Sequence, residues 1–232
     1  MSRGLKALAA VAVVVALVAW GFRALTQDDP GPSGGGPAAP HSRATLPPTP
    51  ADVPAEGLYV VSTITAAGEV NVETWLRVPQ PITELDLTTT DPDLLPGSTE
   101  SLDLIVRTMD GRLLAHRDSV GTNPQTIRLR EPASDLYFSY TIDGAMDDAS
   151  STVPGRKLAR VLAMDVDYAG AGGVVHRLVT SPGTVLNVAC LRPSKDFDAT
   201  PRPCGRPTGD GDWIVDLRGD DWHDRLLAQL EA

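Results

Sequence analysis

The only two cysteines of the chain, Cys190 and Cys204, lie in the proline-rich stretch VACLRPSKDFDATPRPCG. Tetrahedral zinc takes four Cys or His ligands, and a redox pair has the CxxC spacing, so this pair fits neither chemistry. Two lone cysteines in an exported protein are typical of one disulfide bond. We therefore expect a Cys190–Cys204 disulfide that constrains a loop with little apolar surface of its own; two free thiols are the alternative.

A second group of reactive side chains lies near the C-terminus, where the stretch DDWHD holds Asp220, Asp221, His223 and Asp224. Carboxylates and imidazole are ligands for divalent cations. The same residues also suit the start of a helix, where the dipole favours acidic side chains, or a solvated surface. A metal site at these four residues is therefore the weaker interpretation, and we expect no metal and no other cofactor.

Trp75 is the third candidate, because it falls on the polar side of an alternating run. Val70, Val72 and Thr74 alternate with residues that include Glu73, Trp75 and Arg77, the period of a half-buried strand. An exposed tryptophan can stack on a sugar or anchor a protein interface. Contact of Trp75, with Glu73 and Arg77, to a ligand or partner is the weaker interpretation; the alternatives are that a loop or the C-terminal helix covers Trp75 or that the strand has the opposite burial.

No catalytic residue is assigned from the sequence, and the chain is interpreted as a non-enzymatic module. The string GPSGG at residues 31–35 matches a nucleophile motif, but it lies in a Pro/Gly-rich stretch rather than between a strand and a helix. The motifs SxxK and HExxH and the phosphate-binding glycine patterns do not occur. The alternative is an envelope hydrolase or a carbohydrate-active or carbohydrate-binding domain that uses surface carboxylates and Trp75.

From residue 57 onward the chain reads as about ten or eleven short strands separated by turn signals. This spacing is typical of an all-β fold, and we expect an antiparallel β-sandwich, immunoglobulin-like or jelly-roll-like, over residues 57–232. One domain is preferred to two domains divided near residues 143–155. The final stretch, GDDWHDRLLAQLEA, predicts one C-terminal helix at 219–231, because its apolar residues fall on one helical stripe: Trp222, Leu226, Leu227 and Leu230.

The N-terminal region predicts a membrane anchor followed by a stalk. Basic residues precede an apolar stretch, which gives a cytoplasmic N-terminus at 1–6 and a transmembrane helix, a signal anchor, at 7–25. Residues 26–56 are rich in Pro and Gly and predict a disordered linker. The positive-inside rule places the later residues outside the cytoplasmic membrane in a single-pass arrangement; the alternative is secretion after signal-peptide cleavage.

The charge of the chain limits the classes of partner that it can bind. The formal net charge is −10, and residues 1–56 hold four basic and four acidic side chains, so the excess belongs to residues 57–232. An acidic domain without a basic patch disfavours nucleic acid as a partner. The scarcity of Lys beside abundant Arg, Ala and Gly suggests a GC-rich bacterial coding sequence. We expect an extracytoplasmic accessory module of a bacterial cell envelope, whose partners are the membrane, through the N-terminal helix, and another envelope protein or a cell-wall polymer.

Overall fold

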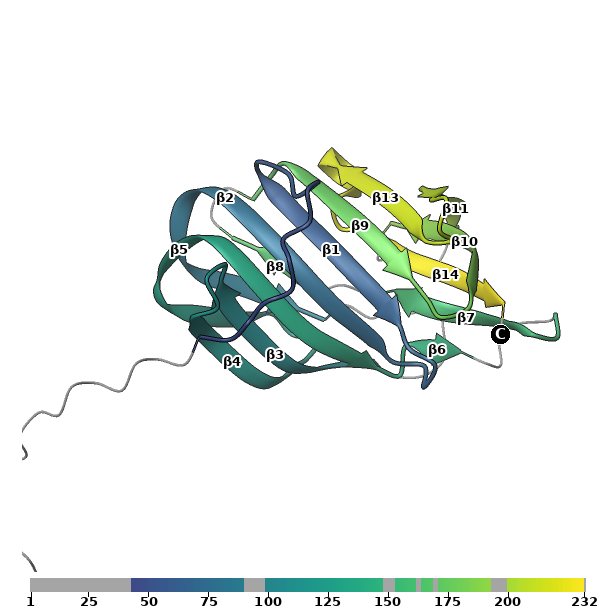
Figure 1. The fold of residues 1–232 in the computed structure, drawn as a ribbon, viewed down its shortest axis with the longest axis horizontal. Coiled ribbons are helices and arrows are strands. Elements are labelled where there is room, and N and C mark those ends of the chain that lie inside the picture. The colour runs from purple at the N-terminus through teal and green to yellow at the C-terminus, as the bar shows by residue number, and fades with distance from the viewer. Residues whose placement is uncertain are drawn as a thin grey trace, which may run out of the picture. The chain divides into compact units, whose positions relative to one another are not determined.

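The described chain is built almost entirely of β-strands, as the alternating runs of the sequence predict (Figure 1). The structure is a computed structural model that describes residues 43–89, 99–147, 153–161, 164–168, 171–192 and 200–231. The expected cytoplasmic N-terminus (1–6), the expected transmembrane helix (7–25) and the first part of the expected linker lie outside the described residues. Within the described residues, no helix is long and apolar enough to cross a membrane.

Two sheets carry these strands. The nine-stranded sheet has the order β12-β13-β9-β1-β2-β5-β3-β4, with β8 paired to β2. Its strands are β1 (Gly57–Ile64), β2 (Val70–Thr88), β3 (Glu100–Thr108), β4 (Leu113–Val120), β5 (Gln125–Asp143), β8 (Asp165–Asp167), β9 (Val174–Thr180), β12 (Arg206–Pro207) and β13 (Trp213–Arg218). The five-stranded sheet has the order β11-β10-β14-β7-β6. Its strands are β6 (Met146–Asp147), β7 (Arg156–Val161), β10 (Thr184–Leu191), β11 (Arg202–Pro203) and β14 (Arg225–Glu231).

The nine-stranded sheet is mixed rather than purely antiparallel. Strand β1 pairs with β9 in parallel, with Leu58 opposite Val175 and Val61 opposite Leu178. The all-β expectation is therefore confirmed, whereas the expectation that all strands pair antiparallel is wrong at this pair. The reason is that strands β2–β8 separate β1 from β9 along the chain, so no hairpin turn dictates the direction of β9. This pairing also places strands from both sides of residues 143–155 in one sheet.

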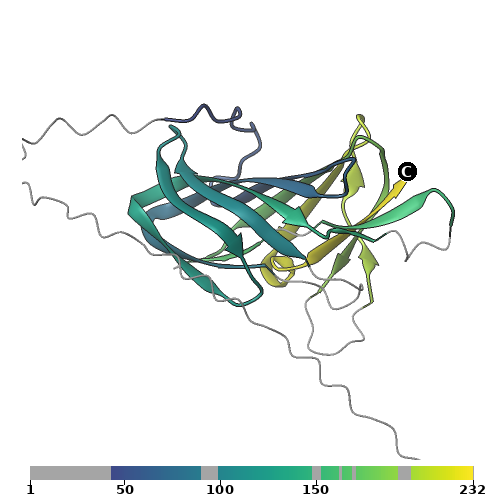
Figure 2. The same cartoon turned by 90° about the horizontal axis from the view of Figure 1, so that it is seen from below.

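The long strands β2 and β5 pair along most of their length but bend together at one end of the sheet (Figures 1 and 2). Their register breaks between Arg77 and Ile82. Pro79 and Pro81 in β2, and Pro132 in β5, lie at this bend, and proline donates no ladder hydrogen bond. Beyond the bend, the side-chain hydroxyl of Thr89 donates a 2.8 Å hydrogen bond to the carbonyl oxygen of Val120 at the end of β4.

One hydrophobic core draws on both sheets. It contains Leu76 and Phe138 of the nine-stranded sheet and Val161, Val188 and Leu226 of the five-stranded sheet, all of them buried. Its members are mostly aliphatic, because the chain holds only three Phe, four Trp and four Tyr. In β1 the side chains alternate, so Leu58 and Val60 enter this core while Tyr59 and Val61 lie on the opposite face.

The predicted C-terminal helix at 219–231 is wrong. Residues Gly219–Asp221 form a single 3₁₀ turn, and Arg225–Glu231 form strand β14 between β10 and β7. Neighbouring Leu226 and Leu227 are both buried, which puts apolar side chains on both faces of a central strand. A strand buried on both faces reads as a continuous apolar run, and such a run also fits a helical stripe.

Candidate interaction surface

The outer face of the nine-stranded sheet carries a line of aromatic side chains that crosses four strands. Strand register places His176 beside Tyr59, Tyr59 beside Trp75, and Trp75 beside Tyr137. We call these four residues the aromatic row. The ring centroids are 6.4, 6.1 and 5.4 Å apart along the row, distances at which aromatic rings attract one another.

Polar side chains hold both ends of the aromatic row. At one end, Nδ1 of His176 contacts the carboxylate of Asp216, its direct neighbour on β13. At the other end, the Tyr137 hydroxyl donates a 2.7 Å hydrogen bond to Oε1 of Glu73. Burial raises the pKa of Tyr137, and the Glu73 carboxylate raises it further. Tyr137 is therefore a neutral hydrogen-bond donor at physiological pH rather than an acid or base.

Residues 43–56, which we call the cover segment, lie over the Trp75–Tyr137 half of the row. Val53 is buried against Trp75 and Tyr137, and Leu46 packs on the same small cluster. The Arg77 guanidinium donates a 3.4 Å hydrogen bond to the carbonyl oxygen of Val53. The sequence assigned this segment to the disordered linker, but its apolar residues pack on the sheet.

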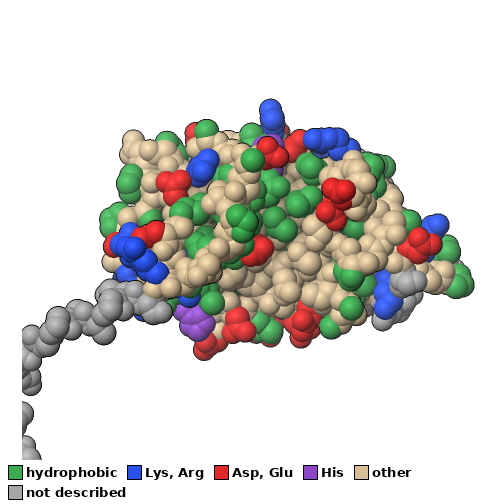
Figure 3. Space-filling view, viewed as in Figure 1, with side chains coloured by type: hydrophobic (Ala, Val, Ile, Leu, Met, Phe, Trp, Pro, Cys, Tyr) green, Lys and Arg blue, Asp and Glu red, His purple; other side chains and the backbone are tan. Residues whose placement is uncertain are grey.

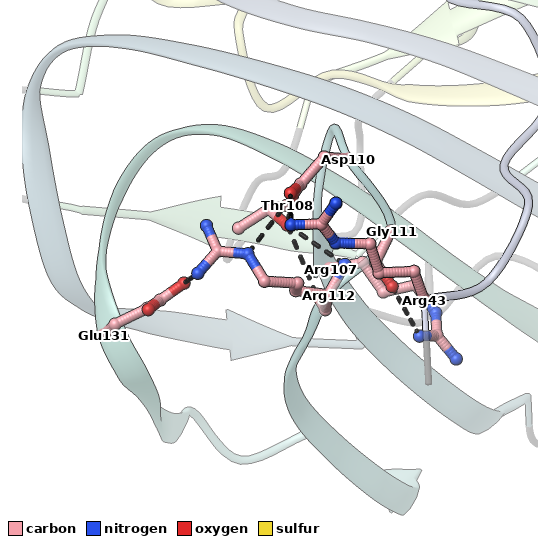
Figure 4. A network of polar contacts seen from close by, with 7 residues as sticks. All are labelled: Arg43, Arg107, Thr108, Asp110, Gly111, Arg112 and Glu131. Atoms are coloured by element: carbon pink, nitrogen blue, oxygen red, sulfur yellow. Dashed lines mark hydrogen bonds and ion pairs between the residues drawn. The ribbon is translucent and has the colours of Figure 1, made fainter. Parts of the chain in front are cut away.

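A polar network at the β3–β4 turn fixes the start of the cover segment (Figure 4). The guanidinium of Arg43 lies 3.2 Å from the carboxylate of Asp110. The backbone N–H of Ala44 donates a 3.2 Å hydrogen bond to the carbonyl oxygen of Gly111. The hydroxyl of Thr108 donates to Asp110, and this bond lowers the pKa of Asp110 below its ordinary value, with help from Arg112 and Arg43.

The outer face continues beside the cover segment with partly apolar side chains, and the first of them, Val61, also packs against the small cluster of Val53, Trp75 and Tyr137. Val61, Leu178 and Ile214 lie side by side across β1, β9 and β13, and each is only half-buried. We call these three residues the apolar row. Figure 3 shows apolar side chains gathered near the middle of this face. Clustered apolar side chains on a sheet face are typical of interaction sites.

The structure corrects the prediction for Trp75. Its side chain is 2% exposed, so it does not offer a stacking surface to solvent. The cover segment buries Trp75. The alternative interpretation, in which a loop covers this side chain, is therefore the one that the structure supports. Glu73 and Arg77 remain half-buried on the same face, bonded to Tyr137, Val53 and Asp135. The three predicted residues thus lie together, but Trp75 anchors the cover segment instead of an external ligand.

Salt bridges to arginine occupy two carboxylates of the predicted metal site, Asp221 and Asp224. Asp221 contacts Arg192 and Arg202, and Asp224 contacts Arg202. His223 faces Asp165 at 3.4 Å. Within the part of the chain that the structure describes, no group of three or more His, Cys, Asp or Glu side chains is arranged to hold a metal ion.

Cys190 and Cys204 lie at disulfide-bonding distance, with their Cα atoms 5.6 Å apart. Cys190 is fully buried in β10, and Cys204 follows the short strand β11, which pairs with β10. The pair therefore fixes β11 to the edge of the five-stranded sheet. This position sets Arg202 beside Asp221 and Asp224.

A groove of about 460 Å³ lies where β8 joins the second half of β2, and acidic residues line it. Asp86 is directly opposite Asp167 in the β2–β8 ladder, and Glu84 lies two residues before Asp86. The Asp86 carboxylate accepts a 2.6 Å hydrogen bond from the Thr126 hydroxyl. Like charges directly opposite one another weaken strand pairing, so this arrangement is not explained by sheet stability.

Sequence reasoning missed a set of charged groups buried between the sheets. Arg177 and Arg225 are 4% and 5% exposed. Arg225 forms a two-pronged salt bridge to Asp165, with N–O distances of 2.8 and 2.6 Å. The alternation in β9, where Val175 and Val179 point to the core, could have shown that Arg177 points inward as well.

Comparisons with known proteins give no family for this chain. No protein-family model matches it. No curated protein matches it at a significant level.

Several solved structures share a weak structural likeness. Native leukotriene A4 hydrolase from Saccharomyces cerevisiae has a TM-score of 0.43 and 10% identity, over 76% of this chain and 29% of the other. The yeast enzyme with bestatin has a TM-score of 0.42 and 9% identity, over 75% and 28%. An M1 zinc metallopeptidase mutant from Deinococcus radiodurans, bound to a Tyr-Ser-Ala substrate, has a TM-score of 0.36 and 12% identity, over 75% and 42%. The chain thus spans less than half the length of each, and likenesses at this level carry no argument about activity.

Proposed function

We propose that this chain is a membrane-anchored, extracytoplasmic accessory module of a bacterial cell envelope. In this proposal the two sheets form a β-sandwich, residues 7–25 hold it at the cytoplasmic membrane, and the module binds another envelope protein without catalysing a reaction. The observation that carries the binding role is the apolar row of Val61, Leu178 and Ile214. These side chains are only half-buried on an otherwise folded sheet, and burying them against a partner would be favourable.

The cover segment supports the same role. It shows that the outer face accepts an extended chain, because Val53 and Leu46 already pack on one half of the aromatic row. The apolar row continues this surface, because Val61 packs against the same cluster and Leu178 and Ile214 follow it on the neighbouring strands. A partner segment laid beside the cover segment would therefore contact Tyr59 and the apolar row together.

Site-specific cross-linking in intact cells tests this proposal. A photoreactive residue at Leu178, Val61 or Ile214 is expected to capture the same envelope protein. A photoreactive residue at Val153, which is 44% exposed at a turn outside the nine-stranded sheet, is the control and should not capture it. With the captured protein purified, Leu178→Glu should weaken binding at least tenfold, because it places a charge in an apolar contact. Equal cross-linking from all four positions would contradict the proposal.

The anchoring has its own test. An alkaline phosphatase reporter fused after Ala232 is expected to be active, because this enzyme requires an oxidising compartment. The full-length chain should fractionate with the membrane, whereas a chain cleaved after export should appear in the soluble fraction. An inactive reporter would contradict an extracytoplasmic domain.

A carboxylate-dependent hydrolase is the second candidate, and one observation favours it. The groove beside β8 holds Asp86 and Asp167 directly opposite each other with Glu84 nearby, and glycoside hydrolysis uses two carboxylates across a cleft. Hydrolysis of cell-wall glycans by the purified chain that is lost in both Asp86→Asn and Asp167→Asn would establish it. Trp75 takes no part in this candidate because it is buried.

A further inference from the structure

The edge of the nine-stranded sheet is open along the second half of β13. Strand β13 pairs with β9 over its whole length, from Trp213 to Arg218. On its other side it pairs only with the short strand β12, at Trp213 and Ile214. Figure 1 shows β13 along one border of this sheet, beside β9. Among the described residues, the stretch from Val215 to Arg218 therefore has a strand partner on one side only.

The chain before β12 turns away from β13 instead of continuing along it. Gly205 still lies against β13, since a Cβ atom there would be 2.5 Å from the carbonyl oxygen of Ile214. One residue earlier, the backbone N–H of Cys204 donates a 3.1 Å hydrogen bond to the carbonyl oxygen of Val188 in β10, in the other sheet. The bond to Cys190 holds Cys204 at that sheet. The second half of β13 is therefore left without a neighbour from β12.

Asp216 and Arg218 direct their backbone N–H and C=O groups to this open side. The N–H of Val174 donates a 3.4 Å hydrogen bond to the carbonyl oxygen of Glu56, so the even-numbered residues of β9 bond toward β1. Backbone groups alternate along a strand, so the odd-numbered residues of β9 bond to the odd-numbered residues of β13 opposite them. The even-numbered residues of β13 therefore point away from β9, as the carbonyl oxygen of Ile214 does.

The side chains of the same two residues are exposed and carry opposite charges. The carboxylate of Asp216 contacts Nδ1 of His176 on the outer face. Arg218 forms no ion pair with any other residue that the structure describes. Charges on an edge strand usually discourage pairing with another chain. Two opposite charges two residues apart can instead attract an edge with the same pattern.

One antiparallel register between two copies of this edge pairs all of these groups. With a two-fold axis at Leu217, Asp216 of each copy lies opposite Arg218 of the other. Each of these two pairs can exchange both backbone hydrogen bonds, and opposite charges meet on the outer face. An axis at Asp216 or at Arg218 would place like charges opposite each other. The axis at Asp216 would also require the edge of Ile214, which β12 occupies.

We propose that the open edge of β13 pairs with the same edge of a second copy of this chain, so that two nine-stranded sheets join into one. The contact spans three residues of each strand, and stable complexes bury about 1,200 Å² or more, so the dimer is weak in dilute solution. Tethering of two copies to one membrane raises their effective concentration, a step that rests on the proposed function. The two apolar rows then lie on the same face of the joined sheet.

Cysteine cross-linking between two tagged copies of the full-length chain tests the pairing in intact cells. One copy carries Asp216→Cys and the other Arg218→Cys, two positions that lie directly opposite each other in this register. Oxidation is expected to join the two copies, whereas copies that carry Val153→Cys, at an exposed turn, should not be joined. No mixed cross-link, equal cross-linking at Val153, or adducts with another protein alone would overturn the proposal. The readout counts only pairs of this chain, so it is separate from capture of an envelope protein by the apolar row.

Exchange of the two charges gives a readout that needs no added cysteine. Energy transfer between donor-labelled and acceptor-labelled full-length chains in lipid vesicles is expected to fall at least twofold in Arg218→Asp, because this variant places two carboxylates opposite each other. The double variant Asp216→Arg with Arg218→Asp should restore the transfer, because opposite charges meet again in the same register. Arg128→Asp, which changes an exposed arginine of β5, is the control and should behave as the wild type. A double variant that transfers no better than Arg218→Asp would contradict the register.

Discussion

The backbone N–H of Ala44 donates a 3.2 Å hydrogen bond to the carbonyl oxygen of Gly111, which joins the cover segment to the β3–β4 turn. Gly111 has a φ of +86°, a conformation that side chains rarely adopt. A Cβ atom at this position would lie 2.1 Å from the carbonyl oxygen of Ala44. Glycine is therefore required both by the turn and by the close approach of the cover segment.

The variant Gly111→Ala is expected to detach the start of the cover segment. The left-handed conformation alone costs an alanine about 1–2 kcal/mol, and the clash with Ala44 adds to this cost. Trypsin should then cleave after Arg43 faster than in the wild type, and acrylamide should quench Trp75 more. The control is Gly209→Ala, where an added Cβ meets nothing within 4 Å. Cleavage at the wild-type rate in Gly111→Ala would show that the contact is unimportant.

Acid should loosen the same junction through Asp110. The hydrogen bond from Thr108, and then Arg112 and Arg43, hold the pKa of Asp110 below its ordinary value of 3.8. A lowered pKa in the folded state gives stability that is present above pH 3.8 and is lost as the pH falls through the folded-state value. The wild type should therefore keep Trp75 protected from acrylamide until the pH falls below about 4.

The variant Asp110→Asn separates this effect from general acid unfolding. It lacks the carboxylate at every pH, so its Trp75 should be more accessible than that of the wild type already at pH 7. Glu100→Gln, which changes an exposed carboxylate at the start of β3, should behave as the wild type. Identical quenching of the Asp110→Asn variant and the wild type at pH 7 would contradict the role of Asp110.

The alternation of apolar and polar residues was enough to predict most strands. It did not predict which other segments pack on each face of a strand. Alternation identified β2 correctly, because one side of that strand faces the core. It predicted an exposed Trp75, because the residues that cover it are distant in sequence and lie in a proline-rich segment. Alternation shows that two faces differ, but it does not show what covers the more polar one.

The end of the chain illustrates a different limit. Leu226, Leu227 and Leu230 fit a helical stripe, and leucine, alanine and glutamine favour helices. Strand β14 instead gains partners on both edges, with Leu226 opposite Cys190 and Val161. Tertiary pairing of this kind overrides a weak local preference, and nothing within the segment itself reveals it.

The cysteine pair could be anticipated because its chemistry leaves few options at that spacing. Closing a loop of about fifteen residues stabilises a fold by about 3 kcal/mol in the chain-entropy model. A reductant should therefore lower the urea midpoint of the wild type. A double variant, Cys190→Ala with Cys204→Ala, should have the lower midpoint without reductant and show no further shift. A wild-type midpoint that ignores the reductant would contradict a stabilising bond.

Asp224 should give the folded chain an unusual response to pH. Its side chain is fully buried, and this burial raises the pKa of its carboxyl, although Arg202 partly opposes the shift. A raised pKa means that the folded state holds the proton more tightly than the unfolded state, so ionisation of Asp224 costs stability. The free energy of unfolding should therefore decline, through this group, as the pH rises from about 3.8 through the folded-state value. In Asp224→Asn this decline should be absent. The free energy of unfolding of the variant, relative to that of the wild type, should therefore increase as the pH rises over that range. Urea unfolding at a series of pH values measures this difference, and a constant difference would show that Asp224 titrates alike in the folded and unfolded chain.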